Sequence, residues 1–233
     1  MRPRADWLAA LMAWRRDLYC LAAAPLERLC RRSDQAGIIA ADISRWCIVR
    51  PVRSKTPVRR FMELVAECTE FRNVLYYRLK QGSPRDVVVS WLASRVWRPL
   101  EQLELACPSI GPGLVILHGQ GTIVHAVRIG SNFTVHHQVT LGWRLGAAHP
   151  PVVGDDVMVG VGARILGAVS VGDGAQIGAN AVVVSDVPAY HVAVGVPARC
   201  SPRRPSGAES RDAADYEPSL GAAGADWMVT RWR

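Results

Sequence analysis

The chain has 233 residues, of which 49% are hydrophobic and 21% are charged, and its formal net charge is +8. This balance is typical of a folded protein with a buried core and excludes a wholly disordered chain. No apolar run reaches the length of about eighteen residues that a membrane span requires. The N-terminal apolar run lacks the uninterrupted core and the cleavage site of a signal peptide.

The basic excess is unevenly distributed. Arginine crowds between Arg2 and Arg60 and again near Arg199, whereas the segment between Ile110 and Val196 is close to balanced. Such an excess suits an anionic ligand, a nucleic acid or an acidic membrane surface. Because the sequence has no nucleic-acid motif and no aromatic stacking platform, we expect no nucleic-acid partner. The six cysteines are scattered, without CxxC pairs or histidines at metal spacing, which favours free thiols, no bound metal and a cytoplasmic location.

Residues 1–107 have the pattern of a helical domain. Phe61, Leu64, Val65 and Cys68 recur at helical spacing, and a second apolar face follows from Val74 to Leu79. Ser83 and Pro84 are typical of a helix cap and a first helical position, which predicts a further helix that extends to Leu100.

From Ile110 to Arg199 the pattern changes to a period of six. An aliphatic residue recurs at every sixth position, and a small or medium apolar residue follows it by four. The aliphatic positions are Val153, Val159, Ile165, Val171, Ile177 and Val183, and the same frame runs upstream through Ile129, Val135, Leu141 and Ala147. Neither a helix nor an ordinary strand has this period, whereas the flat faces and tight corners of a β-helix do. Three hexads make one triangular coil, so the block predicts roughly five coils.

The expected fold class is therefore α+β, with an N-terminal α-helical domain followed by a C-terminal left-handed parallel β-helix. We place the helical domain at residues 1–107, the β-helix at 108–200 and a tail at 201–233. The tail is rich in Ser, Pro, Arg, Ala, Gly and Asp and is expected to be disordered.

The repeat block resembles the serine acetyltransferase family of hexapeptide-repeat acyltransferases. The stretches that carry the likeness are 110–121, 139–142, 160–167, 177–184 and 194–199, together with the helical segment 70–79. The resemblance implies acetyl transfer from acetyl-CoA to a hydroxyl, with L-serine as the acceptor and a place in cysteine biosynthesis. It also implies a homotrimer or a dimer of trimers, with acetyl-CoA bound in the groove between neighbouring β-helices.

The resemblance also implies the site residues. His118 matches the family's catalytic histidine, in a turn with Gly119 and Gly121, and a neutral imidazole there can take the proton of an acceptor hydroxyl. His149, followed by Pro150, resembles the second active-site histidine. Glu104 is the nearest counterpart of the family's carboxylate, which would hold the second ring nitrogen of the base. His137 lies one coil after His118 and is expected to stack over it, as a packing or substrate contact.

For acetyl-CoA, the turns that hold Gly162, Ala163 and Ala179 are expected to offer backbone amides to the pantetheine arm. Arg164 and Arg199 are expected to meet its phosphates.

Two departures from the family pattern concern the acceptor. Leu117 stands where the serine enzymes have Asp, and Ala148 stands where they have Arg. The missing charges would hold the ammonium and carboxylate groups of serine, so a hydroxyl of a sugar or polysaccharide is the alternative acceptor.

Two further alternatives remain open at this point. Some trimeric left-handed β-helices are zinc carbonic anhydrases that use three histidines across the subunit interface, and His118, His136, His137 and His149 are sufficient in number. The last alternative is a non-catalytic assembly protein.

Overall fold

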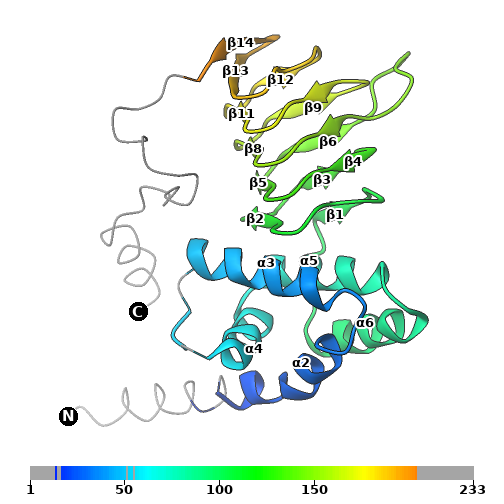
Figure 1. Ribbon diagram of the computed structural model, residues 1–233, viewed down its shortest axis with the longest axis vertical. Coiled ribbons are helices and arrows are strands. Elements are labelled where there is room, and N and C mark those ends of the chain that lie inside the picture. Colours follow the sequence, from blue (N-terminus) through cyan, green and yellow to red (C-terminus); the bar gives the residue numbers. More distant parts are fainter. Residues whose placement is uncertain (1–13, 15–16, 51, 55, 204–233) are drawn as a thin grey trace, which may run out of the picture.

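The computed structural model describes residues 14, 17–50, 52–54 and 56–203, and nearly all of the predicted tail 201–233 lies outside them. The described chain has two parts, a group of helices and a stack of short strands that rises from it (Figure 1). Helices α3 and α5 lie nearest to the stack, and α2 lies at the end away from it. The predicted order of a helical part and a β-helix is confirmed.

The helical part holds five named helices and a short helical run before them. They are α2 (Ala24–Cys30), α3 (Ala36–Val49), α4 (Pro57–Glu67), α5 (Thr69–Lys80) and α6 (Pro84–Val96). Phe61, Leu64 and Val65 are buried on α4 as their spacing predicted, and Cys68 is the buried residue between α4 and α5. These apolar side chains form one core with those of α5.

Helix α6 begins as predicted and ends earlier. The Ser83 side chain accepts from the backbone N–H of Asp86, and the Asp86 side chain accepts from that of Ser83, which completes a capping box. The helix ends at Val96, four residues before the predicted Leu100. Pro99 explains the difference, since a proline disfavours helical geometry in the residue before it and has no N–H to donate.

The strands stack into three sheets. They are β1 (Leu103–Leu105), β2 (Val115–Leu117), β3 (Thr122–Val124), β4 (Arg128–Ile129), β5 (Thr134–His136), β6 (Thr140–Gly142), β7 (Val152–Val153), β8 (Met158–Val159), β9 (Arg164–Leu166), β10 (Ser170–Val171), β11 (Gln176–Ile177), β12 (Val182–Val183), β13 (His191–Gly195) and β14 (Ala198–Pro202). The sheet orders are β1-β3-β6-β9-β12, β10-β7-β4 and β14-β13-β11-β8-β5-β2. All named strand pairs are parallel except β13 with β14.

The six-residue frame predicted the β-helix core. All six repeat positions from Val153 to Val183 are at most 3% exposed, and the small residues four positions later are at most 2% exposed. Ala147 is the exception, because it falls in the loop between β6 and β7 instead of a strand. The sheet structure also begins earlier than residue 108, since β1 starts at Leu103 and pairs with β3.

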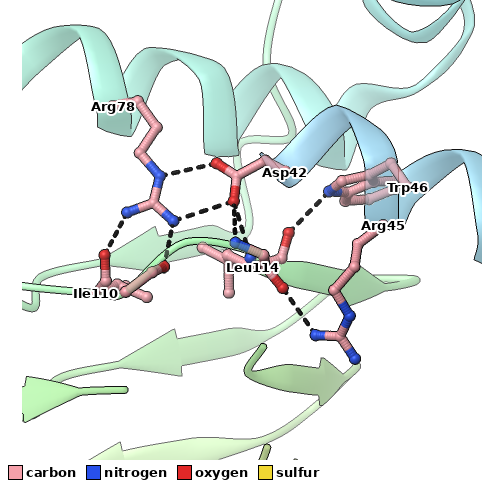
Figure 2. A network of polar contacts seen from close by, with 8 residues as sticks. Asp42, Arg45, Trp46, Arg78, Ile110 and Leu114 are labelled. Carbon is pink, nitrogen blue, oxygen red and sulfur yellow. Dashed lines mark hydrogen bonds and ion pairs between the residues drawn. The ribbon is translucent and has the colours of Figure 1, made fainter. Parts of the chain in front are cut away.

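A polar network joins the helical part to the first coil (Figure 2). Arg78 of α5 pairs with Asp42 of α3, and its guanidinium also donates to the carbonyl oxygens of Ile110 and Gly111. Asp42 accepts from the backbone N–H groups of Gly113 and Leu114 at 2.7 and 2.9 Å. The network fixes α5 over the coil that carries His118.

Candidate active site

His118 lies on an enlarged corner of the β-helix. Leu117 pairs with His136 and Ile123 with Thr140, so residues 118–122 span a corner that residues 137–139 span in the next coil. The first corner therefore has two residues more than the second and projects further. His118 itself is exposed and has a positive φ of 60°. The same left-handed geometry occurs at other corner residues, including Gln138 and Asn180, so it marks the corner of the coil.

His137 lies directly over His118. The two ring centroids are 6.0 Å apart with an interplanar angle of 81°, an edge-to-face arrangement. The predicted stacking is thus confirmed. Within the described part of the chain the His137 Nδ1 is buried and has no hydrogen-bond partner. His137 therefore packs against the His118 ring and makes no hydrogen bond at its Nδ1 among the described residues.

The predicted base and most of the predicted acetyl-CoA residues lie in one column. The strand register places His118, His137, Val161 and Ala179 on successive coils of the same edge, between the sheets of β2 and β3. Gly162 and Ala163 belong to the same corner as Val161. With coils about 4.8 Å apart, the column from His118 to Ala179 extends over roughly 14 Å. Arg199 does not join it, since it is exposed on β14 opposite Val194.

The backbone of the Gly162 corner is already hydrogen-bonded. The N–H of Gly162 donates to the His137 carbonyl at 3.1 Å, and that of Ala163 donates to the Gly160 carbonyl at 3.3 Å. Gly162 has a φ of +70°, and a Cβ on it would lie 2.2 Å from the Asn180 Oδ1, so a larger residue would require the Asn180 side chain to move. These two amides stabilise the corner, which leaves the exposed Ala179 one coil further along as the more open position.

Arg164 is anchored to the same corner. Its Nη1 donates to the carbonyl oxygens of Gly162 and Ala163 at 2.8 and 3.2 Å and to that of Gln138. The guanidinium therefore lies at the column as a fixed positive charge, beside the residue that follows His137.

Glu104 points outward from β1. It is exposed and pairs with Ile123 of β3. No hydrogen bond joins Glu104 to His118 among the described residues. The structure therefore places this carboxylate on the sheet next to the His118 corner without a hydrogen bond between the two side chains.

His149 lies at a different edge of the β-helix. It is exposed in the loop between β6 and β7, and its Nδ1 is 2.7 Å from the Pro150 carbonyl. This loop leaves the carboxyl end of β6, whereas the His137 corner precedes the amino end of β6. The width of a sheet therefore separates His149 from His118 within one chain.

Glu70 is a neighbour of the site that the sequence did not single out. It lies in the first turn of α5, and its Cγ is 3.4 Å from where a Cβ on Gly119 would be. Its carboxylate accepts from the Thr69 hydroxyl at 3.0 Å. Only the position of Glu70 in the segment 70–79 marks it in the sequence, and the fold of α5 onto the first coil is what brings it to the His118 corner.

No group of three His, Cys, Asp or Glu side chains is arranged to hold a metal ion in the part of one chain that the structure describes. None of the six cysteines, all of which lie among the described residues, forms a disulfide. None of the described helices combines the length and the apolar character needed to cross a bilayer.

Comparisons with known proteins agree with this geometry. Residues 150–185 match the family model of the bacterial transferase hexapeptide (six repeats). The structure is similar to that of serine acetyltransferase from Neisseria gonorrhoeae in complex with serine, with 30% identity, a TM-score of 0.52, and coverage of 70% of this chain and 68% of that chain. The chain belongs to the serine acetyltransferase family.

Two other members of the family extend the comparison. Serine acetyltransferase from Helicobacter pylori strain J99 is 46% identical over 93 residues, which are 39% of this chain and 54% of that protein. The structure of the Brucella abortus enzyme in complex with coenzyme A has 27% identity and a TM-score of 0.53, covering 72% of this chain and 67% of that one. The chain thus spans about half the length of the Helicobacter relative in the family.

Proposed function

We propose that this chain is an acetyl-CoA-dependent O-acetyltransferase whose base is His118 and whose first candidate acceptor is L-serine. The single observation that carries the proposal is the column of His118, His137, Val161 and Ala179 on one edge of the β-helix. Relatives solved in complex with serine and with coenzyme A support the choice of acceptor and donor.

The chemistry follows from the exposed imidazole of His118. In the neutral form the ring accepts the proton of the acceptor hydroxyl while that oxygen attacks the thioester carbonyl carbon. The tetrahedral intermediate collapses with cleavage of the carbon–sulfur bond, and the imidazolium returns the proton to the leaving thiolate. The acetyl ester and free CoA thiol are the products, so protons and electrons balance. Glu70, which lies beside Gly119, and Glu104, on the adjacent strand β1, are the candidate carboxylates for stabilising the transient imidazolium.

Acetyl-CoA fits the same edge. An extended pantetheine arm can run along the column from His118 toward the exposed Ala179, past the corner of Gly162 and Ala163, where the Arg164 guanidinium lies against the backbone carbonyls. The fixed guanidinium of Arg164 and the exposed Arg199 supply positive charge for phosphate groups.

The active site needs a second chain if His149 takes part. The loop that carries His149 extends away from the coils (Figure 1), and it exposes Trp143 at 53% and Leu145 completely. Large exposed apolar side chains on a loop are typical of a contact surface. We therefore propose a homotrimer, or a dimer of such trimers, in which His149 of one chain approaches His118 of the next.

A saccharide hydroxyl is the second candidate acceptor. Leu117 and Ala148 precede the two histidines, and neither side chain can pair with the ammonium or carboxylate of an amino acid. An uncharged acceptor has no ammonium or carboxylate group, so it would lose no ion pair at these two positions.

The test is thiol release from acetyl-CoA by the purified chain, with L-serine compared with a panel of sugars. We expect His118→Ala to lower kcat by about a hundredfold or more, the usual contribution of a general base. His191→Ala is the matched control, because His191 is on β13 at a different corner, where its Nδ1 contacts the Ala189 carbonyl. Unchanged turnover in His118→Ala would remove the assignment. Stoichiometric zinc in the purified protein would instead favour the carbonic anhydrase alternative.

A further inference from the structure

Helix α6 presents an unusual face to solvent. Its inner side buries Asp86, Val89, Ser90 and Ala93. Its outer side is apolar, with exposed fractions between 42% and 57% for Val87, Val88, Trp91, Leu92 and Val96. A helix at the surface of a globular protein normally turns polar residues outward. These five residues, together with the exposed Arg85 and Arg95, are termed the α6 surface.

The charge on the α6 surface has one sign. Asp86 is the one acidic residue of the helix, and it is 3% exposed and bonded to Ser33 and Ser83. Arg85 and Arg95 are exposed, and the guanidinium carbon of Arg95 lies 4.9 Å from the centroid of the Trp91 ring. The outer face of α6 therefore combines large apolar side chains with cations and carries no exposed carboxylate.

Neighbouring elements extend this positive charge. Helix α2 packs against α6 and exposes Arg28, with Arg31 and Arg32 exposed just beyond its end. Arg31 forms an ion pair with Glu27, the buried acid of α2, so Arg28 and Arg32 are the side chains that extend the positive charge. The sequence shows the same bias on a larger scale. Residues 1–107 hold 19 basic and 11 acidic residues, a net charge of +8, and residues 108–233 hold 9 of each, a net charge of 0. The whole net charge of the chain therefore belongs to its helical portion.

We propose that the α6 surface docks onto a membrane surface that contains anionic lipid headgroups. Arginine pairs well with phosphate groups, and its aliphatic stem can lie along apolar surface while the guanidinium stays at the headgroups. Tryptophan favours the interface between headgroups and acyl chains. A helix of this kind lies in the interface with its apolar side chains partly inserted and does not span the bilayer.

A second copy of the chain fits the α6 surface less well. A twofold contact would bring the α6 surface against itself, since both partners use the same patch. Arg85 and Arg95 would then face arginines of the other copy with no exposed carboxylate on either helix. Like charges opposed across an interface are unfavourable, whereas phosphate headgroups neutralise them.

The test uses the full chain and sedimentation with vesicles. One set of vesicles is phosphatidylcholine alone, and the other contains phosphatidylglycerol as well. We expect binding to the anionic vesicles to be tighter by about tenfold or more and to weaken as salt is added.

Two variants separate the apolar from the charged contribution. Trp91→Gln with Leu92→Gln removes apolar contact and is expected to weaken binding to anionic vesicles by about tenfold. Arg85→Gln with Arg95→Gln is expected to remove most of the preference for anionic vesicles. The matched controls are Ile48→Gln on α3, which is 61% exposed, and Arg128→Gln on β4, which is also exposed. Both controls should bind as the unaltered chain does.

Three results would overturn the proposal. The first is equal binding to the two kinds of vesicle, or no binding to either. The second is a set of α6 variants that bind as tightly as the controls. The third is a change in the mass of the lipid-free protein, measured by light scattering, in the α6 variants and not in the controls, which would make the α6 surface a contact between copies. All substituted side chains are exposed, and circular dichroism verifies that each variant is folded.

Discussion

The carboxylate of Asp42 and the guanidinium of Arg78 form a buried ion pair, with Asp42 Oδ2 2.8 Å from Arg78 Nε and both side chains at most 3% exposed. Every remaining hydrogen-bond partner of these two side chains is a backbone group of the segment 110–114, at the start of the β-helix. The pair therefore fixes two helices and the first coil in one arrangement (Figure 2), and this arrangement places Glu70 next to the His118 corner.

Removal of one partner from this pair should be costly. Asp42→Asn keeps the size of the side chain but leaves the Arg78 charge buried without a counterion, so we expect the free energy of unfolding to fall by about 3–5 kcal/mol. Urea unfolding followed by circular dichroism measures the loss. Asp34→Asn is the control, since Asp34 is exposed, and it should change stability by less than about 0.5 kcal/mol. Equal stability of the two variants would contradict the structural role of the pair.

Close backbone approach between coils should make any side chain at position 160 destabilising. A Cβ at this position would lie 2.8 Å from the backbone nitrogen of Ala179 and 2.9 Å from the Ile177 carbonyl oxygen, and backbone atoms cannot move aside cheaply. We expect Gly160→Ala to destabilise the protein by about 1–3 kcal/mol.

Gly37→Ala is the comparison variant, and its change in stability should have the opposite sign to that of Gly160→Ala. Gly37 is in α3 and has open space around its Cβ position, so alanine should stabilise the helix by roughly 0.5–1 kcal/mol. Thermal unfolding of the two variants measures both changes. Opposite signs would show that the space around the Cβ position determines the change in stability on replacing glycine by alanine.

Buried thiols should make the protein less stable in alkali. Burial raises the pKa of both Cys30 and Cys68 from 9.0 to about 12. The folded state therefore keeps a proton that the unfolded chain releases above pH 9. Stability is complete below pH 9 and falls between about pH 9 and pH 12, by up to 1.4 kcal/mol per pH unit for each thiol.

Urea unfolding at about pH 8 and about pH 10 tests this dependence. Cys30→Ala and Cys68→Ala should each make the loss smaller, whereas Cys200→Ala should not, because Cys200 is exposed. A loss that is the same in all three variants would assign the alkaline effect to other groups.

The aromatic contact over His118 should influence turnover. His137→Leu removes the ring that packs edge-to-face against His118, and such a contact contributes about 0.5–1.5 kcal/mol. We expect kcat for thiol release from acetyl-CoA to fall by roughly two- to tenfold, while His137→Phe, which keeps an aromatic ring, should retain most of it. Equal values of kcat in the two variants would exclude a role for the ring.

The six-residue period predicted the β-helix because a repeating coil is a local rule. Each hexad places one aliphatic side chain inward, so Val153, Ile165 and Ile177 are buried whatever the rest of the chain does. The helices α4 and α5 and the start of α6 followed in the same way from apolar spacing and from the Ser83 cap. The His118 motif and the stacking of His137 were also visible, since one full coil separates them.

Contacts between segments far apart in the chain could not be predicted from the spacing of residues in the sequence. The sequence did not indicate that Asp42 and Arg78 meet, that Glu70 lies beside Gly119, or that α6 turns an apolar face outward. Sequence spacing gives the face of an element on which a residue lies, but not what packs against that face. The period-six pattern thus determined the scaffold and the edge that holds His118. The tertiary structure placed Glu70 beside that edge and separated His149 from it. Both outcomes depend on contacts that no local repeat encodes, because the first follows from packing of the helices on the first coil and the second from the path of the β6–β7 loop.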